Sequence, residues 1–445
     1  MFRRIFLSLA VLVGSTPLWC QVEPSATGGS GTTDDDSLMS MPPAISGSFY
    51  PSEVGSQGRE NVLSGGLLFT AAYDDNVLAG GGGTGTIGAE SYTILPNIEI
   101  STSTSRLRGS LNYSPGFMFY DPTTYLNQVT QNADADFQFR WTPHTTLAVQ
   151  EVFRQNSTVF SEPYTVSGAT ISGSGSSGYP IVIAPYAGQI MDSTSAHVGY
   201  QFSRSSMISA SGNYSSFSFS NSTASQGLYS SHGGGGSGSY SRRFGRAQYL
   251  GLSYRYAISE TTPSPSTTES QFATVFYSVQ LSNSFSLSAS GGPEYTTTSV
   301  PGTSTIATWA PSGNGSIGWQ RRRAAVTLGY SRAVTTGWGL FGSFTADSAT
   351  ASARWQFTQR LTGGLSGNYS NTKNATPSIT TTSLAGHTVF GRASLDYMLG
   401  QHLNLVGEYN RLHNTFSGIV AISDDPDADR IAVSLSYGFR RPLGR

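Results

Sequence analysis

The chain has 445 residues, a net charge of −1 and 11% charged residues, well below the roughly 25% of an ordinary soluble domain. It has no surplus of Lys and Arg, which argues against nucleic acid as a partner, and its one cysteine, Cys20, excludes a disulfide framework and a thiolate metal site. Aromatic residues reach 12% and glycine 52 residues. This composition suits a protein whose outer surface faces lipid.

The N-terminus has the layout of a secretory signal peptide. The Arg3-Arg4 pair precedes an apolar run, Ile5–Val13, which is too short to span a membrane because a spanning helix needs about 20 apolar residues. We expect residues 1–20 to be a signal peptide cleaved near Cys20. A lipoprotein anchor on Cys20 is disfavoured because Trp19 is bulkier than the small residue expected before a lipobox cysteine.

Residues 21–61 are polar and low in apolar content, which predicts a disordered periplasmic linker. From Val62 onward the chain consists of alternating segments, and no later stretch is apolar for 18 residues. Helical spanning is therefore excluded. A closed β-barrel is the remaining structure that satisfies every backbone group inside a bilayer. We expect residues 62–439 to form an outer-membrane β-barrel and residues 440–445 a short C-terminal tail.

The alternation has period two, as in a strand that faces two solvents. In ADADFQFRW, residues 133–141, every second residue is Ala, Phe or Trp, and the residues between them are Asp, Gln or Arg. The polar side chains cannot face lipid, so we expect them to face a wet lumen. The lumen-facing charge candidates are Asp134, Asp136, Arg140, Arg255, Arg354, Arg392, Asp396 and Glu408. The blurred alternation at 150–152 predicts a bulge or a shifted register.

Short turns punctuate the chain at regular intervals. They are expected near Ser105, Pro143, Ser205, Gly245, Ser284, Arg322, Arg360 and Gly400. Neighbouring turns are 38 to 40 residues apart except for one interval of 62, which fits two strands, one turn and one longer loop per repeat. The long interval contains a Gly/Ser/Pro-rich insertion, 157–189. Eight turns and nine loops predict an all-β, antiparallel, up-and-down transmembrane barrel of about eighteen strands, with sixteen as the alternative. Both chain ends then lie on the periplasmic side.

Aromatic residues flank the short turns, as expected of an interfacial girdle. They are Trp141, Tyr200, Phe202, Phe244, Trp319, Trp355, Phe357, Tyr397 and Tyr437. A β-propeller or β-solenoid is the soluble alternative, but a propeller blade would place four strands in about 40 residues, with continuous buried runs. The repeat here holds about two long strands.

No motif predicts catalysis or a cofactor. GTGTIG, residues 83–88, matches the dinucleotide fingerprint but lacks the preceding buried strand and following helix, so a surface loop is expected. The six histidines have no partner that the sequence can place beside them; they are His144, His197, His232, His387, His402 and His413. The acidic segment 424–429 lacks the Gly turn and the bidentate Glu of a calcium loop, so a solvated loop is favoured over a Ca²⁺ site. We expect no enzyme, no metal and no cofactor.

Two segments resemble known families. The ending IAVSLSYGF is similar to the C-terminal signal of bacterial outer-membrane proteins, in which a terminal aromatic follows apolar residues at alternate positions and is read by the barrel-assembly machinery. The matching positions are Ile431, Val433, Leu435, Tyr437 and Phe439. The sequence departs from the family pattern in continuing past the aromatic to Arg445.

The second segment, YDDNV, resembles the first-strand motif of a bacterial outer-membrane β-barrel family often associated with exopolysaccharide or capsule systems. Its residues are Tyr73, Asp74, Asp75, Asn76 and Val77. The resemblance implies passage of saccharides or export of polysaccharide.

The predicted function is therefore a porin-like passive channel in the outer membrane of a Gram-negative bacterium. The predicted partners are outer-membrane lipid, the barrel-assembly machinery and saccharides or exopolysaccharide. The alternative is a structural or surface-binding barrel whose lumen is plugged by 157–189. A barrel enzyme is a further alternative.

Overall fold

The computed structural model describes residues 61–77, 87–156, 188–219, 229–245, 248–262, 265–282, 284–302, 305–336, 343–375, 385–417 and 427–443. The predicted signal peptide, nearly all of the predicted linker, most of the GTGTIG segment and the insertion up to residue 187 lie outside these residues. Within them, no helix has the length and apolar character needed to cross a membrane.

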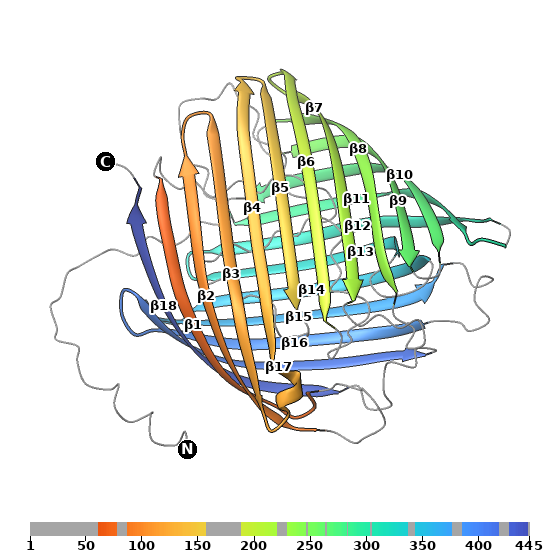
Figure 1. Cartoon of the computed structure of the whole chain (residues 1–445). Coiled ribbons are helices and arrows are strands. Elements are labelled where there is room, and N and C mark those ends of the chain that lie inside the picture. Colours follow the sequence, from red (N-terminus) through yellow and green to blue (C-terminus); the bar gives the residue numbers. More distant parts are fainter. Residues whose placement is uncertain are drawn as a thin grey trace, which may run out of the picture. The chain divides into compact units, whose positions relative to one another are not determined.

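Eighteen antiparallel strands form the described part of the chain (Figure 1). They are β1 (Val62–Asp74), β2 (Ala89–Ser103), β3 (Leu107–Asp121), β4 (Gln128–Thr142), β5 (Thr145–Asn156), β6 (Gln189–Ser203), β7 (Ser206–Phe219), β8 (Ser230–Phe244), β9 (Gln248–Thr262), β10 (Ser266–Ser282), β11 (Phe285–Ser299), β12 (Ile306–Arg321), β13 (Ala324–Thr336), β14 (Ser343–Gln356), β15 (Leu361–Asn374), β16 (Ala385–Met398), β17 (Leu403–Ser417) and β18 (Ala428–Pro442). A 3₁₀ turn, η1 (Thr124–Leu126), joins β3 to β4.

The sheet is closed, because β1 pairs with β2 on one side and with β18 on the other. Every other strand pairs with its two neighbours in sequence. The predicted eighteen-stranded antiparallel barrel is confirmed, and the sixteen-stranded alternative is wrong. Each of the eight predicted short turns falls between two strands. Val62 pairs with Ser101 and with Pro442, so both ends of the barrel lie on the short-turn side, as predicted.

The two faces of the wall differ in the way that alternation predicts. Large apolar side chains at every second position are exposed, and we call this side the outer face. Most of the aromatic residues expected beside the short turns are exposed there: Trp141, Tyr200, Phe202, Phe244, Trp355, Phe357, Tyr397 and Tyr437. Trp319 is half-buried. The residues between them point to the inner face, where Ser, Thr and Asn are often buried. An outer belt of this kind suits hydrocarbon rather than water.

The bulge predicted at 150–152 is wrong, because β4 and β5 pair regularly there. The register instead shifts between Arg140 and Thr142, next to the turn. The alternation is blurred for another reason. Glu151 stands on the outer face opposite Thr194, whose side chain is its hydrogen-bond partner, so a polar group occupies a position where the pattern requires an apolar one.

The closing strand packs tightly on the first strand. Gly65 is opposite Phe439, and a Cβ atom on Gly65 would lie 2.8 Å from Phe439 Cζ and 3.2 Å from the Asn97 carbonyl oxygen. The aromatic ring at the end of the IAVSLSYGF pattern therefore occupies the space that this glycine leaves. The strand also continues past Phe439, because Arg440 and Arg441 pair with Ser64 and Leu63.

Gly65→Val should destabilise the barrel by about 1–3 kcal/mol, because the new side chain overpacks the contact with Phe439. The measurement is the urea midpoint of the protein folded in phospholipid vesicles. Gly407→Val on the neighbouring β17 is the matched control, since a Cβ there would have no atom within 4 Å. Equal effects of the two substitutions would contradict the packing role of Gly65.

Candidate functional site

The inner face is lined by rows of hydroxyl groups that bond to one another across neighbouring strands. Five such pairs are Thr70–Ser434 (2.8 Å), Ser209–Ser239 (2.6 Å), Ser211–Ser237 (2.7 Å), Ser253–Thr274 (2.5 Å) and Ser288–Ser316 (2.5 Å). Each hydroxyl both donates and accepts, so a bonded pair keeps free lone pairs for a solute or for water. The face is therefore polar without being strongly charged.

Four of the eight predicted lumen charges gather on β14 to β17. Arg392 Nη2 lies 2.9 Å from Glu408 Oε2, and Asn410 Nδ2 donates to Glu408 Oε1 at 2.5 Å. Asp396 interacts electrostatically with Arg354 and Arg392. The Glu408 side chain is 3% exposed and the Arg392 side chain 34%, so the guanidinium is the more accessible end of the pair. The four residues form one polar group, which we call the β14–β17 charge group.

Three further candidates lie on β4. Arg154, on β5, was not among the predicted candidates, and its Nη2 lies 2.7 Å from Asp134 Oδ1. Asp136 occupies the next inner-face position on the same strand, and Arg140 is exposed close to the short turn. The structure therefore does not bring these three residues together with the β14–β17 charge group.

The eighth candidate, Arg255, stands in a cross-strand row with an aromatic ring and a carboxylate. Phe272 pairs with Arg255 on one side and with Glu294 on the other. The Arg255 guanidinium carbon lies 5.5 Å from the centre of the Phe272 ring, a cation–π contact. Glu294 is fully buried and accepts hydrogen bonds from the Val334 N–H at 3.1 Å and from the Ser312 hydroxyl.

Glu294 is an inner-face carboxylate that sequence reasoning missed. The β12–β13 ladder ends at Gly313 and Arg332, whereas both strands continue beyond it, so Val334 has no ladder partner on β12. The carboxylate of Glu294 reaches across and takes this N–H. The opposed pair Pro293 and Pro311 could have indicated the gap, since proline cannot donate to a ladder and marks a local irregularity.

The YDDNV segment lies at the long-loop end of the seam between β1 and β18. Asp74 Oδ1 is 3.6 Å from Arg430 Nε, with side-chain exposures of 3% and 6%. Asp75 accepts from the Asp429 N–H at 2.6 Å, and its own N–H donates to the Asp429 carbonyl at 3.1 Å. Asn76 Nδ2 donates to the Asp427 carbonyl at 2.8 Å. Three consecutive motif residues thus join the first strand to the segment that begins the last strand.

The other two motif residues have different surroundings. Tyr73 is exposed on the outer face, and Val77 is buried against Ala89, Met118 and Tyr120. Along the seam from Tyr73 to Gly65, the five residues of the predicted assembly signal all stand on the outer face, namely Ile431, Val433, Leu435, Tyr437 and Phe439. Between them Ala432, Ser434 and Ser436 are buried on the inner face.

Tyrosine–carboxylate pairs mark the long-loop end of the outer face and were not predicted. The Tyr hydroxyl donates to the acid in the pairs Tyr92–Glu90 (2.7 Å), Tyr330–Asp347 (2.8 Å) and Tyr409–Asp429 (2.6 Å). Tyrosine suits a boundary between lipid and water because its ring is apolar and its hydroxyl is polar. The sequence signal is present only for the first pair, where the acid is two residues away on the same face.

Two histidines that the sequence left isolated lie side by side, which corrects that expectation. The ring centres of His387 and His413 are 5.3 Å apart, on the adjacent strands β16 and β17. Asp427 of the acidic segment bonds to His413 rather than standing free in solvent. Asp424 and Asp425 lie outside the described residues. Within the described residues, no three His, Cys, Asp or Glu side chains converge as a metal-binding group.

The closed wall, with an apolar outer face and a polar inner face, defines a transmembrane β-barrel. No family model and no curated protein matches the sequence. The chain is similar to OpdK of Pseudomonas aeruginosa solved with vanillate (13% identity, TM-score 0.42), and the match covers 85% of this chain and 99% of that chain.

Two other solved structures are similar to about the same degree. OccK2 (OpdF) of Pseudomonas aeruginosa has 11% identity and a TM-score of 0.44, covering 85% of this chain and 98% of that one. OccAB4 of Acinetobacter baumannii has 10% identity and a TM-score of 0.43, covering 86% and 98%.

Proposed function

We propose that this protein is a passive channel of the bacterial outer membrane. The observation that carries the proposal is the two-faced wall of the closed barrel. Exposed apolar side chains cover the outer face, whereas the inner face holds hydroxyl rows and charges of both signs. Charged and hydroxyl-bearing side chains at alternate strand positions are expected on the face that contacts water or a polar solute, because lipid cannot solvate them.

The solute class that we propose is saccharide. Hydroxyl rows that both donate and accept complement the hydroxyls of a sugar, and the paired charges Asp134–Arg154 and Arg392–Glu408 leave no strong excess of one sign at these positions. Export of polysaccharide is a narrower form of the same proposal. It rests on the resemblance of the YDDNV segment, which is short.

A barrel with a filled lumen is the competing function, and one observation favours it. Several inner-face hydroxyls are almost inaccessible, including Thr130, Thr296 and Ser278 at 1% relative exposure. The insertion named as the plug, 157–189, lies almost entirely outside the described residues. A filled barrel would serve as a structural or surface-binding protein rather than a passage.

Single-channel recording decides between the two functions. The folded protein, added to a planar lipid bilayer, should produce discrete current steps. A bilayer that stays at its empty baseline after verified insertion would overturn the channel and favour the filled barrel. The companion measurement is swelling of proteoliposomes in isotonic sugar solutions. Current steps without swelling in mono- or disaccharides would support the channel function and contradict saccharide as its solute.

A further inference from the structure

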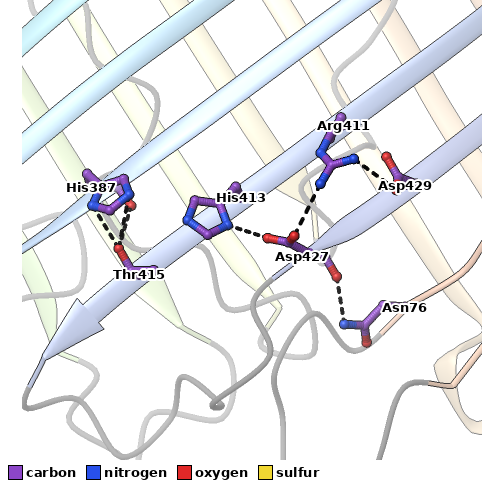
Figure 2. A network of polar contacts seen from close by, with 7 residues as sticks. All are labelled: Asn76, His387, Arg411, His413, Thr415, Asp427 and Asp429. Carbon is purple, nitrogen blue, oxygen red and sulfur yellow. Dashed lines mark hydrogen bonds and ion pairs between the residues drawn. The ribbon is translucent and has the colours of Figure 1, made fainter.

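A pair of histidines stands on the outer face near the long-loop end, apart from the inner-face site. His387 is the third residue of β16 and lies on the same face as the exposed Val389, two residues away. His413 lies on β17 four residues beyond the exposed Tyr409, and therefore on the same face as Tyr409. Figure 2 shows the two imidazoles beside each other, with Thr415 below them and Asp427 on the far side of His413. Both rings belong to strands that pair directly, so their backbones are held in register.

Asp427 fixes the orientation of His413. Its Oδ1 bonds to His413 Nδ1, and its Oδ2 lies 3.3 Å from Arg411 Nη2. Arg411 in turn lies 3.7 Å from Asp429, so the carboxylate of Asp427 is itself held in place. A carboxylate on Nδ1 favours the tautomer that carries its proton there, which leaves a free lone pair on Nε2. In Figure 2 this second nitrogen faces the side of His387 and Thr415.

Thr415 positions the other ring. Its Oγ1 lies 2.9 Å from His387 Nδ1 and 3.4 Å from His387 Nε2. The Tyr369 ring packs on the opposite side, with its centre 6.2 Å from that of His387. The His387 ring is therefore placed by its neighbours beside His413 rather than extended freely from the barrel.

We propose that His387 and His413 bind one first-row transition-metal cation of the Cu²⁺ or Zn²⁺ class through an imidazole nitrogen of each ring. Two imidazoles on one cation, each with a metal–nitrogen distance of about 2 Å, would have ring centres roughly 5 Å apart. The observed separation is 5.3 Å. Imidazole selects Zn²⁺, Cu²⁺ and Ni²⁺, whereas Ca²⁺ and Mg²⁺ need oxygen ligands.

The surroundings suit this class of ligand. Asp427 supplies the carboxylate–histidine contact that commonly supports a metal-bound imidazole. Asp427 is engaged with His413 Nδ1, and the described residues hold no group of three His, Cys, Asp or Glu side chains around one cation, so water would complete the coordination and the cation would exchange readily. The carbonyl of Asp427 also accepts from Asn76, two residues past the end of β1, so the supporting carboxylate belongs to a residue held at the seam.

Copper titration of the untagged, folded protein in detergent tests the proposal. We expect one Cu²⁺ per chain at neutral pH, with electron paramagnetic resonance showing coupling to two imidazole nitrogens. His387→Ala and His413→Ala should each remove one coupled nitrogen and weaken binding at least tenfold. Asp427→Asn should weaken it by about 10- to 100-fold while retaining both nitrogens, as expected for a residue that supports a ligand.

His144→Ala, in the short turn at the other end of the barrel, is the matched control and should bind as the parent protein does. Heat-modifiability on gels verifies that each variant is folded before titration. Copper binding that survives both His387→Ala and His413→Ala, or coupling to a single nitrogen in the parent protein, would overturn the site. Because binding is read without any current, this outcome is independent of whether the barrel conducts.

Discussion

Arg430→Met should lower the unfolding free energy of the barrel by about 3–5 kcal/mol, the range for breaking a buried ion pair by removing one partner. Asp74 and Arg430 are almost inaccessible to solvent and join the first and last strands. Without the guanidinium, the weak bond from the Ser91 hydroxyl at 3.4 Å is what the described residues still offer the Asp74 carboxylate. An uncompensated buried charge at the seam penalises barrel closure directly.

The measurement is urea unfolding in phospholipid vesicles, followed by tryptophan fluorescence. Arg441→Met, on the exposed short-turn end of the same strand, is the control for loss of an arginine and should have little effect. The double variant Asp74→Asn with Arg430→Met should recover much of the loss, because both charges are then absent. If the single and double variants were equally destabilised, the ion pair would not be the reason.

Arg392→Gln should raise the preference of the channel for cations over anions. The substitution removes the more accessible charge of the Arg392–Glu408 pair, so Glu408 loses its ion-pair partner and Asp396 keeps only Arg354. A unit charge about 8 Å from a passing ion, at an effective dielectric constant of about 40, interacts with it by about 1 kcal/mol. We therefore expect about a fivefold change in the permeability ratio.

Reversal potentials in a salt gradient across a planar bilayer give this ratio. Glu408→Gln should shift the ratio in the opposite direction, which distinguishes an electrostatic effect from a change of pore shape. Glu90→Gln removes a carboxylate from the outer face and is the control. A shift of the same size in all three variants would contradict the assignment of the β14–β17 charge group to the path of the ions.

The number and order of the strands followed from the sequence because both depend on local information. Period-two alternation reports the two faces of a single strand, and turn residues report where one strand ends, so 38- to 40-residue spacing sufficed for eighteen strands. In an up-and-down barrel each strand pairs with its neighbour in sequence, so order along the chain becomes order around the wall. The bulge predicted at 150–152 failed because alternation cannot distinguish a register shift from a polar outer residue such as Glu151.

The partners of individual side chains could not be predicted from local information. Asp134 meets Arg154, Arg392 meets Glu408, and Glu294 meets an N–H two strands away. Each contact depends on the cross-strand register and on where a ladder stops. Alternation indicates which face of the sheet a residue lies on, but it does not specify which residue of the next strand stands opposite.

The sequence by itself thus determined a closed, two-faced barrel, because alternate residues of each strand face lipid and the lumen, and this difference is written in the chain as apolar and polar residues in turn. The tertiary structure decided what the YDDNV segment and the histidines contact. Asp74 and Arg430 are 356 positions apart in sequence, and His387 and His413 are 26 apart. Only closure of the seam and the β16–β17 register bring them within reach, because side-chain contacts in a barrel are set by strand pairing rather than by distance along the chain.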